Sequence, residues 1–216
     1  MQSYSLSQNK VLSRVFLGLC GTLLASMCGV IFATQLPYSL IRWLVVLEIC
    51  MFFVAMFMQT RRSIGFGFVY AFTFVSGMTL WPVISYYATT LGAGLVIQAI
   101  AVTAGSFLAT AVIASRSSMD FSFLRGFLLV GSIALLLMMI VSLFTGFSST
   151  MELTYSLLGI AIFVGYILFD VNRIARYGVS EQYVPWIVLS LYLDFVNLFL
   201  FILRLMGVLG GSSNRR

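Results

Sequence analysis

Long apolar runs separated by short polar breaks dominate this chain. A helix crosses the hydrocarbon core of a bilayer with about 20 consecutive apolar residues. Seven runs reach that length and predict seven transmembrane helices, over residues 12–35, 38–59, 64–88, 92–114, 121–145, 152–175 and 184–209. Because the breaks between them are short, neighbouring spans are expected to be antiparallel. We expect one transmembrane domain over residues 1–216.

The composition favours the same class of protein. Hydrophobic residues make up 61% of the 216 residues, and charged residues only 8%. A soluble domain carries roughly 25% charged residues, and no polar stretch here is long enough to form one. The sequence therefore predicts an all-α integral membrane protein whose first partner is the lipid bilayer.

The basic residues predict an orientation in the membrane. Cytoplasmic loops carry an excess of Lys and Arg. The side of the predicted N-terminus holds eight basic residues and the opposite side four, so we expect the N-terminus in the cytoplasm and the C-terminus outside. The eight are Lys10, Arg14, Arg61, Arg62, Arg116, Arg125, Arg173 and Arg176, and the four are Arg42, Arg204, Arg215 and Arg216. The net charge of +6 thus reflects topology, and nucleic acid is not an expected partner.

Missing residue types exclude several functions. The chain has no histidine, which removes Ser–His proteolysis, most transition-metal sites and the usual physiological pH switch. The three cysteines, Cys20, Cys28 and Cys50, form no CxxC pair and are expected to be small buried apolar residues. No phosphate-binding loop is present. We expect neither an enzyme nor a resident cofactor.

Two aspartates stand inside the last two apolar runs. A carboxylate near the centre of a membrane helix costs about 2.5 kcal/mol or more, and such residues are usually functional. The midpoint between Asp170 and Asp194 is Gln182, inside the predicted turn between spans six and seven. The two acids should therefore lie at similar depth, in the cytoplasmic half, and can face each other. In the alternative, Asp170 is an interfacial charge beside Arg173.

The seventh span carries a polar stripe. Ser190, Asp194, Asn197 and Arg204 are separated by four, three and seven residues, which places them on one face of a helix. Such a face must turn away from lipid, so the last helix is expected at the centre of the bundle, with Ser190 and Asn197 lining a polar pathway. The alternative is that these two only form hydrogen bonds between helices.

Three further acids have separate interpretations. Glu48 lies thirteen residues before Arg61, or roughly 20 Å along a helix, which places it near the midplane. It is a candidate pathway acid, or else the partner of Arg204 or Arg42 in a structural ion pair. Asp120 and Glu152 stand at span starts and are expected to be charges at helix N-termini.

Paired carboxylates have a distinct chemistry. Two facing acids cannot both ionise cheaply, so the pair is expected to share a proton. When both are ionised, Asp170 and Asp194 can attract Ca²⁺, which prefers oxygen ligands but needs six to eight of them for tight binding. Weak calcium binding along a pathway is the expectation. Arg61 or Arg62, on the same side, could compete for the carboxylates and act as a latch.

Four segments resemble one known family: residues 74–80 (FVSGMTL), 119–124 (MDFSFL), 165–174 (GYILFDVNRI) and 189–199 (LSLYLDFVNLF). The chain is similar to the transmembrane Bax-inhibitor-motif family, close to its bacterial pH-sensitive calcium-leak members. Phe169 stands where that family usually has a tyrosine. The family also has an arginine at the end of its second span, and an arginine one position before Arg61 would fall on Thr60 in this chain.

The resemblance implies seven helices with the last wrapped by the other six, in a bacterial-type cell inner membrane. It implies a calcium leak controlled by Asp170 and Asp194 as a di-aspartyl proton sensor, with Glu48 as a pathway acid and a latch arginine from the end of span two. Calcium and protons are then the expected ligands. The alternatives are an interaction protein that modulates a membrane protease or other partners, and a proton-coupled cation exchanger. No protein partner is indicated.

Overall fold

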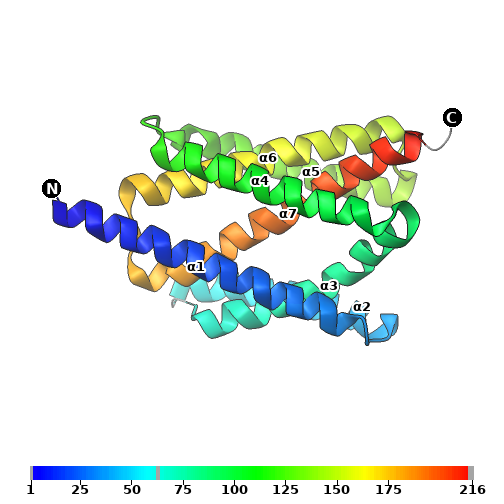
Figure 1. Cartoon of the computed structure of the whole chain (residues 1–216), viewed down its shortest axis with the longest axis horizontal. Coiled ribbons are helices and arrows are strands. Elements are labelled where there is room, and N and C mark those ends of the chain that lie inside the picture. Colours follow the sequence, from blue (N-terminus) through cyan, green and yellow to red (C-terminus); the bar gives the residue numbers. More distant parts are fainter. Residues whose placement is uncertain (1, 62–63, 214–216) are drawn as a thin grey trace. The chain divides into compact units, whose positions relative to one another are not determined.

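In the computed structural model, residues 2–61 and 64–213 are described, with side chains for residues 10–58 and 64–210. Over these ranges the chain is helical and contains no strand. The helices are α1 (Gln2–Ala33), α2 (Tyr38–Arg61), α3 (Phe66–Leu91), α4 (Ala93–Arg116), η1 (Phe121–Phe123), α5 (Leu124–Thr145), α6 (Ser149–Tyr177), η2 (Glu181–Tyr183) and α7 (Val184–Ser213) (Figure 1). The predicted all-α class with seven long helices is confirmed.

Each of the seven α-helices contains a segment long and apolar enough to cross a membrane. Such segments satisfy their backbone hydrogen bonds internally, which is the condition for stability in hydrocarbon. The protein is therefore a multi-pass membrane protein.

Local residues explain several helix ends. Gly146 follows α5 with a φ of 71°, and its N–H donates to the Ser142 carbonyl at 2.8 Å. A positive φ is cheap only for glycine. Asp120 caps η1 by accepting a hydrogen bond from the Ser122 N–H at 2.9 Å, and Glu152 lies in the first turn of α6. The prediction that both acids are charges at helix N-termini is confirmed.

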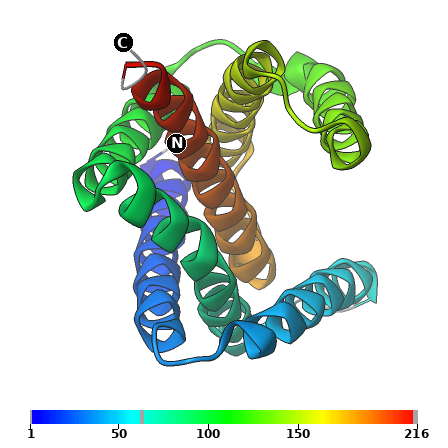
Figure 2. The ribbon, with the colours of Figure 1, turned by 90° about the vertical axis from the view of Figure 1, so that its right-hand side faces the viewer.

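The chain divides into two compact units. Unit 1 comprises Met1–Tyr86 and Tyr177–Tyr192, and unit 2 comprises Tyr87–Arg176 and Leu193–Arg216. α7 is one continuous helix whose first part belongs to unit 1 and whose second part belongs to unit 2 (Figure 2). The single-domain assignment of the chain stays a prediction.

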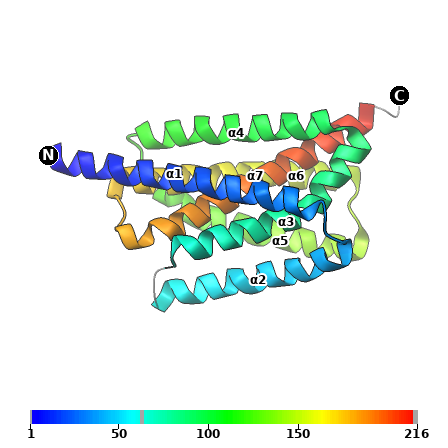
Figure 3. The same ribbon diagram turned by 60° about the horizontal axis from the view of Figure 1, so that its bottom comes forward.

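In unit 1, α1 packs against α3 at the level of the backbone. A Cβ added to Gly29 would collide with the Phe74 carbonyl, and one added to Gly77 would collide with the Ser26 carbonyl. Small residues of this kind let membrane helices approach closely. α2 lies beside α3 (Figure 3), and residues of α1, α2 and α3 pack together around Val75.

In unit 2, α5, α6 and the second part of α7 share an apolar core. Its buried members are Leu128, Leu135, Tyr155, Ile162 and Phe201. α4 joins α7 through an edge-to-face contact between aromatic rings, that of Phe107 and Phe195, whose centroids lie 5.6 Å apart.

α7 is the most buried of the seven spans. In its apolar segment 61% of the residues are buried, against at most 39% in any other span. The helix that carries the polar stripe is therefore the one with the largest buried share, as its charged residues require.

The three cysteines are not buried as the sequence predicts. Cys20, Cys28 and Cys50 are all exposed on the helices rather than buried, so the prediction of burial was wrong. In a membrane protein the outer surface of a span is as apolar as its core. An apolar neighbourhood in the sequence therefore does not distinguish a core position from one that faces lipid.

Candidate functional site

Asp194, on α7, is an almost completely buried acid. Its residue surface is 6% exposed, and its neighbours along the helix, Leu191, Tyr192 and Leu198, are fully buried. One carboxylate oxygen, Oδ2, is buried and has no hydrogen-bond partner among the described residues. A buried polar atom of this kind is costly to keep, which singles out Asp194 as a candidate functional residue.

Asp170 is the acid that the sequence predicts to face Asp194. It is partly buried on α6, and it lies near enough to Asp194 for the two carboxylates to interact electrostatically. Both acids belong to unit 2. The structure thus brings together the two residues that hairpin symmetry paired, and ionisation of both is opposed by their mutual repulsion. Their role as a proton sensor stays a prediction.

α6 is fixed beside this pair by Asn172, two residues after Asp170. The Asn172 side chain is 1% exposed. Its amide nitrogen donates to the carbonyls of Ala114 at 3.0 Å and Met119 at 3.2 Å, and its oxygen accepts from the Phe121 N–H at 3.3 Å. The Asn172 amide therefore ties α6 to the end of α4 and to the connection that follows it.

Arg176 makes a second tie one turn later, where its guanidinium donates to the Ser118 carbonyl. Side chains four residues apart lie on the same face of a helix. Asn172 and Arg176 thus hold the same stretch of α6, the one that follows Asp170, against the same connection.

The other members of the α7 stripe behave differently from one another. Asn197 donates from Nδ2 to the Leu193 carbonyl, one turn back on its own helix, at 2.8 Å. Ser190 is partly buried. The Arg204 guanidinium lies over two rings, 4.9 Å from the centroid of Phe147 and 5.1 Å from that of Tyr155. Its Nη1 is buried without a hydrogen-bond partner among the described residues.

Glu48 lies in unit 1, within a cluster of hydroxyl groups. Its carboxylate accepts a hydrogen bond of 2.5 Å from Thr79 Oγ1, which links α2 to α3. It also lies close enough to Tyr192 to interact with it electrostatically. Its assignment as a pathway acid stays a prediction.

Tyr192 forms the centre of that cluster and is completely buried. Its hydroxyl donates to Ser26 Oγ at 3.0 Å and, more weakly, toward the Thr73 carbonyl at 3.5 Å. The hydroxyl therefore joins the first part of α7 to both α1 and α3.

The latch arginines lie at the limit of the structure. Arg61 is the last residue of α2, but its side chain, like the whole of Arg62, falls outside the described residues. The role of Arg61 or Arg62 as a latch stays a prediction.

The sequence interpretation did not single out Asn172 or Tyr192. Each lies two residues from one of the aspartates, within the segments 165–174 and 189–199. The sequence feature that could have identified them is a hydrogen-bonding side chain within an apolar run, close to a charged residue that is predicted to be buried. It was missed because the partners of both residues are 51 or more residues away in the chain.

The acids do not build a closed metal site. Among the described residues, no group of three or more His, Cys, Asp or Glu is placed to hold a metal ion. Asp170 and Asp194 would supply carboxylate oxygens toward the six to eight that Ca²⁺ takes, leaving the remainder to water or the backbone. Weak calcium binding by this pair stays a prediction.

Comparison with known proteins gives relatives along nearly the whole chain. An uncharacterised membrane protein of Vibrio cholerae is 31% identical over 97% of this chain and 94% of its own length. Bax inhibitor 1 of Schizosaccharomyces pombe is 30% identical over 80% of this chain and 64% of its own length. Protein lifeguard 4 of the mouse is 32% identical over 63% of this chain and 55% of its own length. The family model that matches residues 8–212 is Bax1-I, described as inhibitor of apoptosis-promoting Bax1, and the chain belongs to this family of membrane proteins.

Proposed function

We propose that the protein is a passive, pH-sensitive calcium leak in which Asp170 and Asp194 form the proton sensor. The observation that supports this most directly is the pair itself. A buried carboxylate with an unpartnered oxygen lies close to a second carboxylate, in a chain that has no histidine. No other described pair of acids in this chain combines burial with mutual repulsion.

The sensor has two states that differ by a proton. When the pair holds a proton, the shared charge is compatible with burial, and the carboxylates have little attraction for a divalent cation. When both are ionised, repulsion destabilises the closed packing around Asp194, and a hard cation supplies the missing positive charge. Flux therefore follows the protonation of the pair, whichever state conducts.

Other predicted residues take subsidiary roles in this proposal. Ser190 and Asn197 line the pathway along α7, Glu48 is an acid along the route, and Arg61 or Arg62 is the latch that competes with calcium for the carboxylates. Calcium is the permeant ion and at most a weakly bound ligand, so no resident cofactor and no enzymatic activity are proposed.

We also propose the orientation, with the N-terminus in the cytoplasm of a cell with a bacterial-type inner membrane. The excess of basic residues on the N-terminal side supports it. A reporter enzyme that folds only in the cytoplasm, fused after residue 216, should be inactive. An active fusion would overturn the orientation.

The test is calcium flux into proteoliposomes over a range of external pH. Asp170→Asn and Asp194→Asn replace each carboxyl with a neutral group of the same shape, so each mimics the protonated acid. Wild-type flux should change with pH, while flux through either variant should stay at the level that the wild type shows at its acidic plateau. Asp120→Asn is the matched control, because Asp120 is exposed and asparagine caps helices as well as aspartate does. Its profile should match the wild type.

The same assay separates the alternatives. Calcium accumulation against its own gradient, driven by a proton gradient, would indicate an exchanger in place of a leak. Absence of flux from correctly folded protein, together with a stable co-purifying membrane protein, would indicate an interaction protein.

A further inference from the structure

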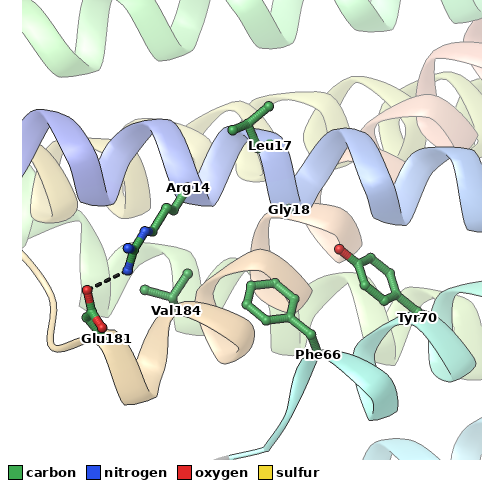
Figure 4. Close-up of a pocket in the computed structure, with 7 residues that line it drawn as sticks. All are labelled: Arg14, Leu17, Gly18, Phe66, Tyr70, Glu181 and Val184. Atoms are coloured by element: carbon green, nitrogen blue, oxygen red, sulfur yellow. Dashed lines mark hydrogen bonds and ion pairs between the residues drawn. The ribbon is translucent and has the colours of Figure 1, made fainter.

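Unit 1 contains a hollow that the calcium pathway does not use. Its volume is about 590 Å³, and it lies between α1, the start of α3 and the start of α7 (Figure 4). Small-molecule sites typically range from about 300 to 1,000 Å³. The lining residues are Arg14, Leu17, Gly18, Phe66, Tyr70, Glu181 and Val184.

The lining is polar at one end and apolar at the other. In Figure 4, Arg14 of α1 and Glu181 of η2 meet at one side, and the rings of Phe66 and Tyr70 stand at the other, with Val184 between them. The two rings are stacked with centroids 5.9 Å apart. A ligand that fills this hollow must itself be charged at one end and apolar at the other.

The order of these residues follows the membrane boundary. Phe66 and Glu181 are the first residues of their candidate spans, and Arg14 lies four residues inside the first span. Tyr70 lies one turn beyond Phe66, or about 6 Å deeper. Glu181 and Phe66 are therefore at the level of lipid headgroups, where aromatic residues also gather. Arg14 and Tyr70 each lie about one turn deeper in their spans, so the hollow extends from the headgroup level toward the acyl chains.

Two glycines let α1 lie close to the other helices that line the hollow. A Cβ added to Gly18 would lie 2.7 Å from Val188 and 3.1 Å from Phe66, and one added to Gly21 would lie 3.0 Å from Tyr70. α1 can approach α3 and α7 here only because these two positions carry no side chain. The aromatic wall then faces a smooth stretch of α1.

The two charges at the mouth can be separated at little cost. Arg14 and Glu181 form an ion pair, but their side chains are 59% and 75% exposed. Ion pairs so open to solvent contribute little to stability. A ligand that offers an anion to Arg14 and a cation to Glu181 replaces one exposed pair with two. Arginine also favours phosphate, which it can bind through two parallel hydrogen bonds.

We propose that this hollow binds one phospholipid with a zwitterionic headgroup that carries a phosphate and a primary ammonium, as phosphatidylethanolamine does. The phosphate binds Arg14, the ammonium donates hydrogen bonds to Glu181, and the upper part of an acyl chain lies along Phe66, Tyr70 and Leu17. The opposite signs of Arg14 and Glu181 select this headgroup over a purely anionic one. A quaternary ammonium has no N–H to donate to Glu181, so a choline headgroup fits less well.

The experiment is native mass spectrometry of the delipidated full-length protein in detergent. Phosphatidylethanolamine, phosphatidylglycerol and phosphatidylcholine with identical acyl chains are titrated separately. We expect one phosphatidylethanolamine to bind about tenfold more tightly than the other two, a difference equal to about 1.4 kcal/mol. Arg14→Gln and Glu181→Gln should each remove that preference. Arg116→Gln and Glu152→Gln, which make the same changes outside the hollow, should retain it.

Two results would overturn the proposal. Equal binding of the three lipids to the wild type would mean that only annular lipid is present. Preference for phosphatidylglycerol that depends on Arg14 but not on Glu181 would mean that the ammonium contact does not exist. The wild-type headgroup comparison decides the matter even if a variant fails to fold. It is also independent of calcium flux, so the leak and the lipid site can fail separately.

Discussion

Gly77→Ala tests the closest contact in unit 1. The added Cβ would meet the Ser26 carbonyl of α1 far inside the 3.0 Å that real Cβ atoms keep. The obstacle is backbone, which cannot rotate away as a side chain can. To regain ordinary contact distance, α1 and α3 must separate by roughly 1 Å or more.

The cost follows from what that separation disturbs. Overpacking of a tight core typically costs about 1–3 kcal/mol. Ser26 also accepts the hydrogen bond of the buried Tyr192 hydroxyl, whose loss adds about 1 kcal/mol. For a chain of this length each kcal/mol lowers the melting temperature by roughly 2–4 °C. The total of about 2–4 kcal/mol should therefore lower the melting temperature of Gly77→Ala by about 4–16 °C.

The assay is thermal unfolding in detergent, followed by circular dichroism, with two matched controls. Added Cβ atoms at Gly67, on the same helix, and at Gly105, on α4, meet nothing within 4 Å. Because alanine is favoured over glycine inside helices by about 0.5–1 kcal/mol, Gly67→Ala and Gly105→Ala should be neutral or slightly stabilising. If Gly77→Ala melts with these controls, α1 and α3 are not in backbone contact and the packing described for unit 1 is wrong.

Two further experiments test the hydrogen bonds of residues close to the two aspartates. Asn172→Ala removes three hydrogen bonds from a buried side chain and should cost about 2–4 kcal/mol in thermal unfolding. Asn197→Ala, whose side chain donates to a carbonyl of its own helix, should cost less than about 1 kcal/mol. Equal losses would contradict the bridging role of Asn172. Tyr192→Phe and Ser26→Ala should show a coupling energy of about 0.5–1.5 kcal/mol in a double-mutant cycle, and additive effects would mean that the two hydroxyls do not interact.

The seven helices could be predicted from the sequence because hydrocarbon imposes a strict rule on length and polarity. The pairing of Asp170 with Asp194 could be predicted for a similar reason. Two residues equidistant from a tight turn are at equal depth, and charged side chains must avoid lipid. The inner position of α7 follows from the same avoidance.

The contacts between distant helices and the exposure of individual apolar residues could not be predicted in this way. The hydrogen bonds of Tyr192 and Asn172 depend on which distant helices pack together, and no local pattern carries that information. The exposure of Cys20 and its two companions could not be predicted, because apolar side chains are equally stable in the core and against lipid. The division into two units depends on which helices pack against the first and the second part of α7. The spacing of apolar residues along one helix does not predict those contacts.

The most direct test of the account is the pH profile of calcium flux through Asp194→Asn in proteoliposomes, beside wild type and Asp120→Asn. Asp194 is the more buried of the two acids in the proposed sensor, and one of its carboxylate oxygens has no hydrogen-bond partner among the described residues. The account predicts a profile for Asp194→Asn that is flat and equal to the acidic plateau of the wild type, with Asp120→Asn unchanged. A profile for Asp194→Asn that rises and falls with pH as the wild type does would contradict it.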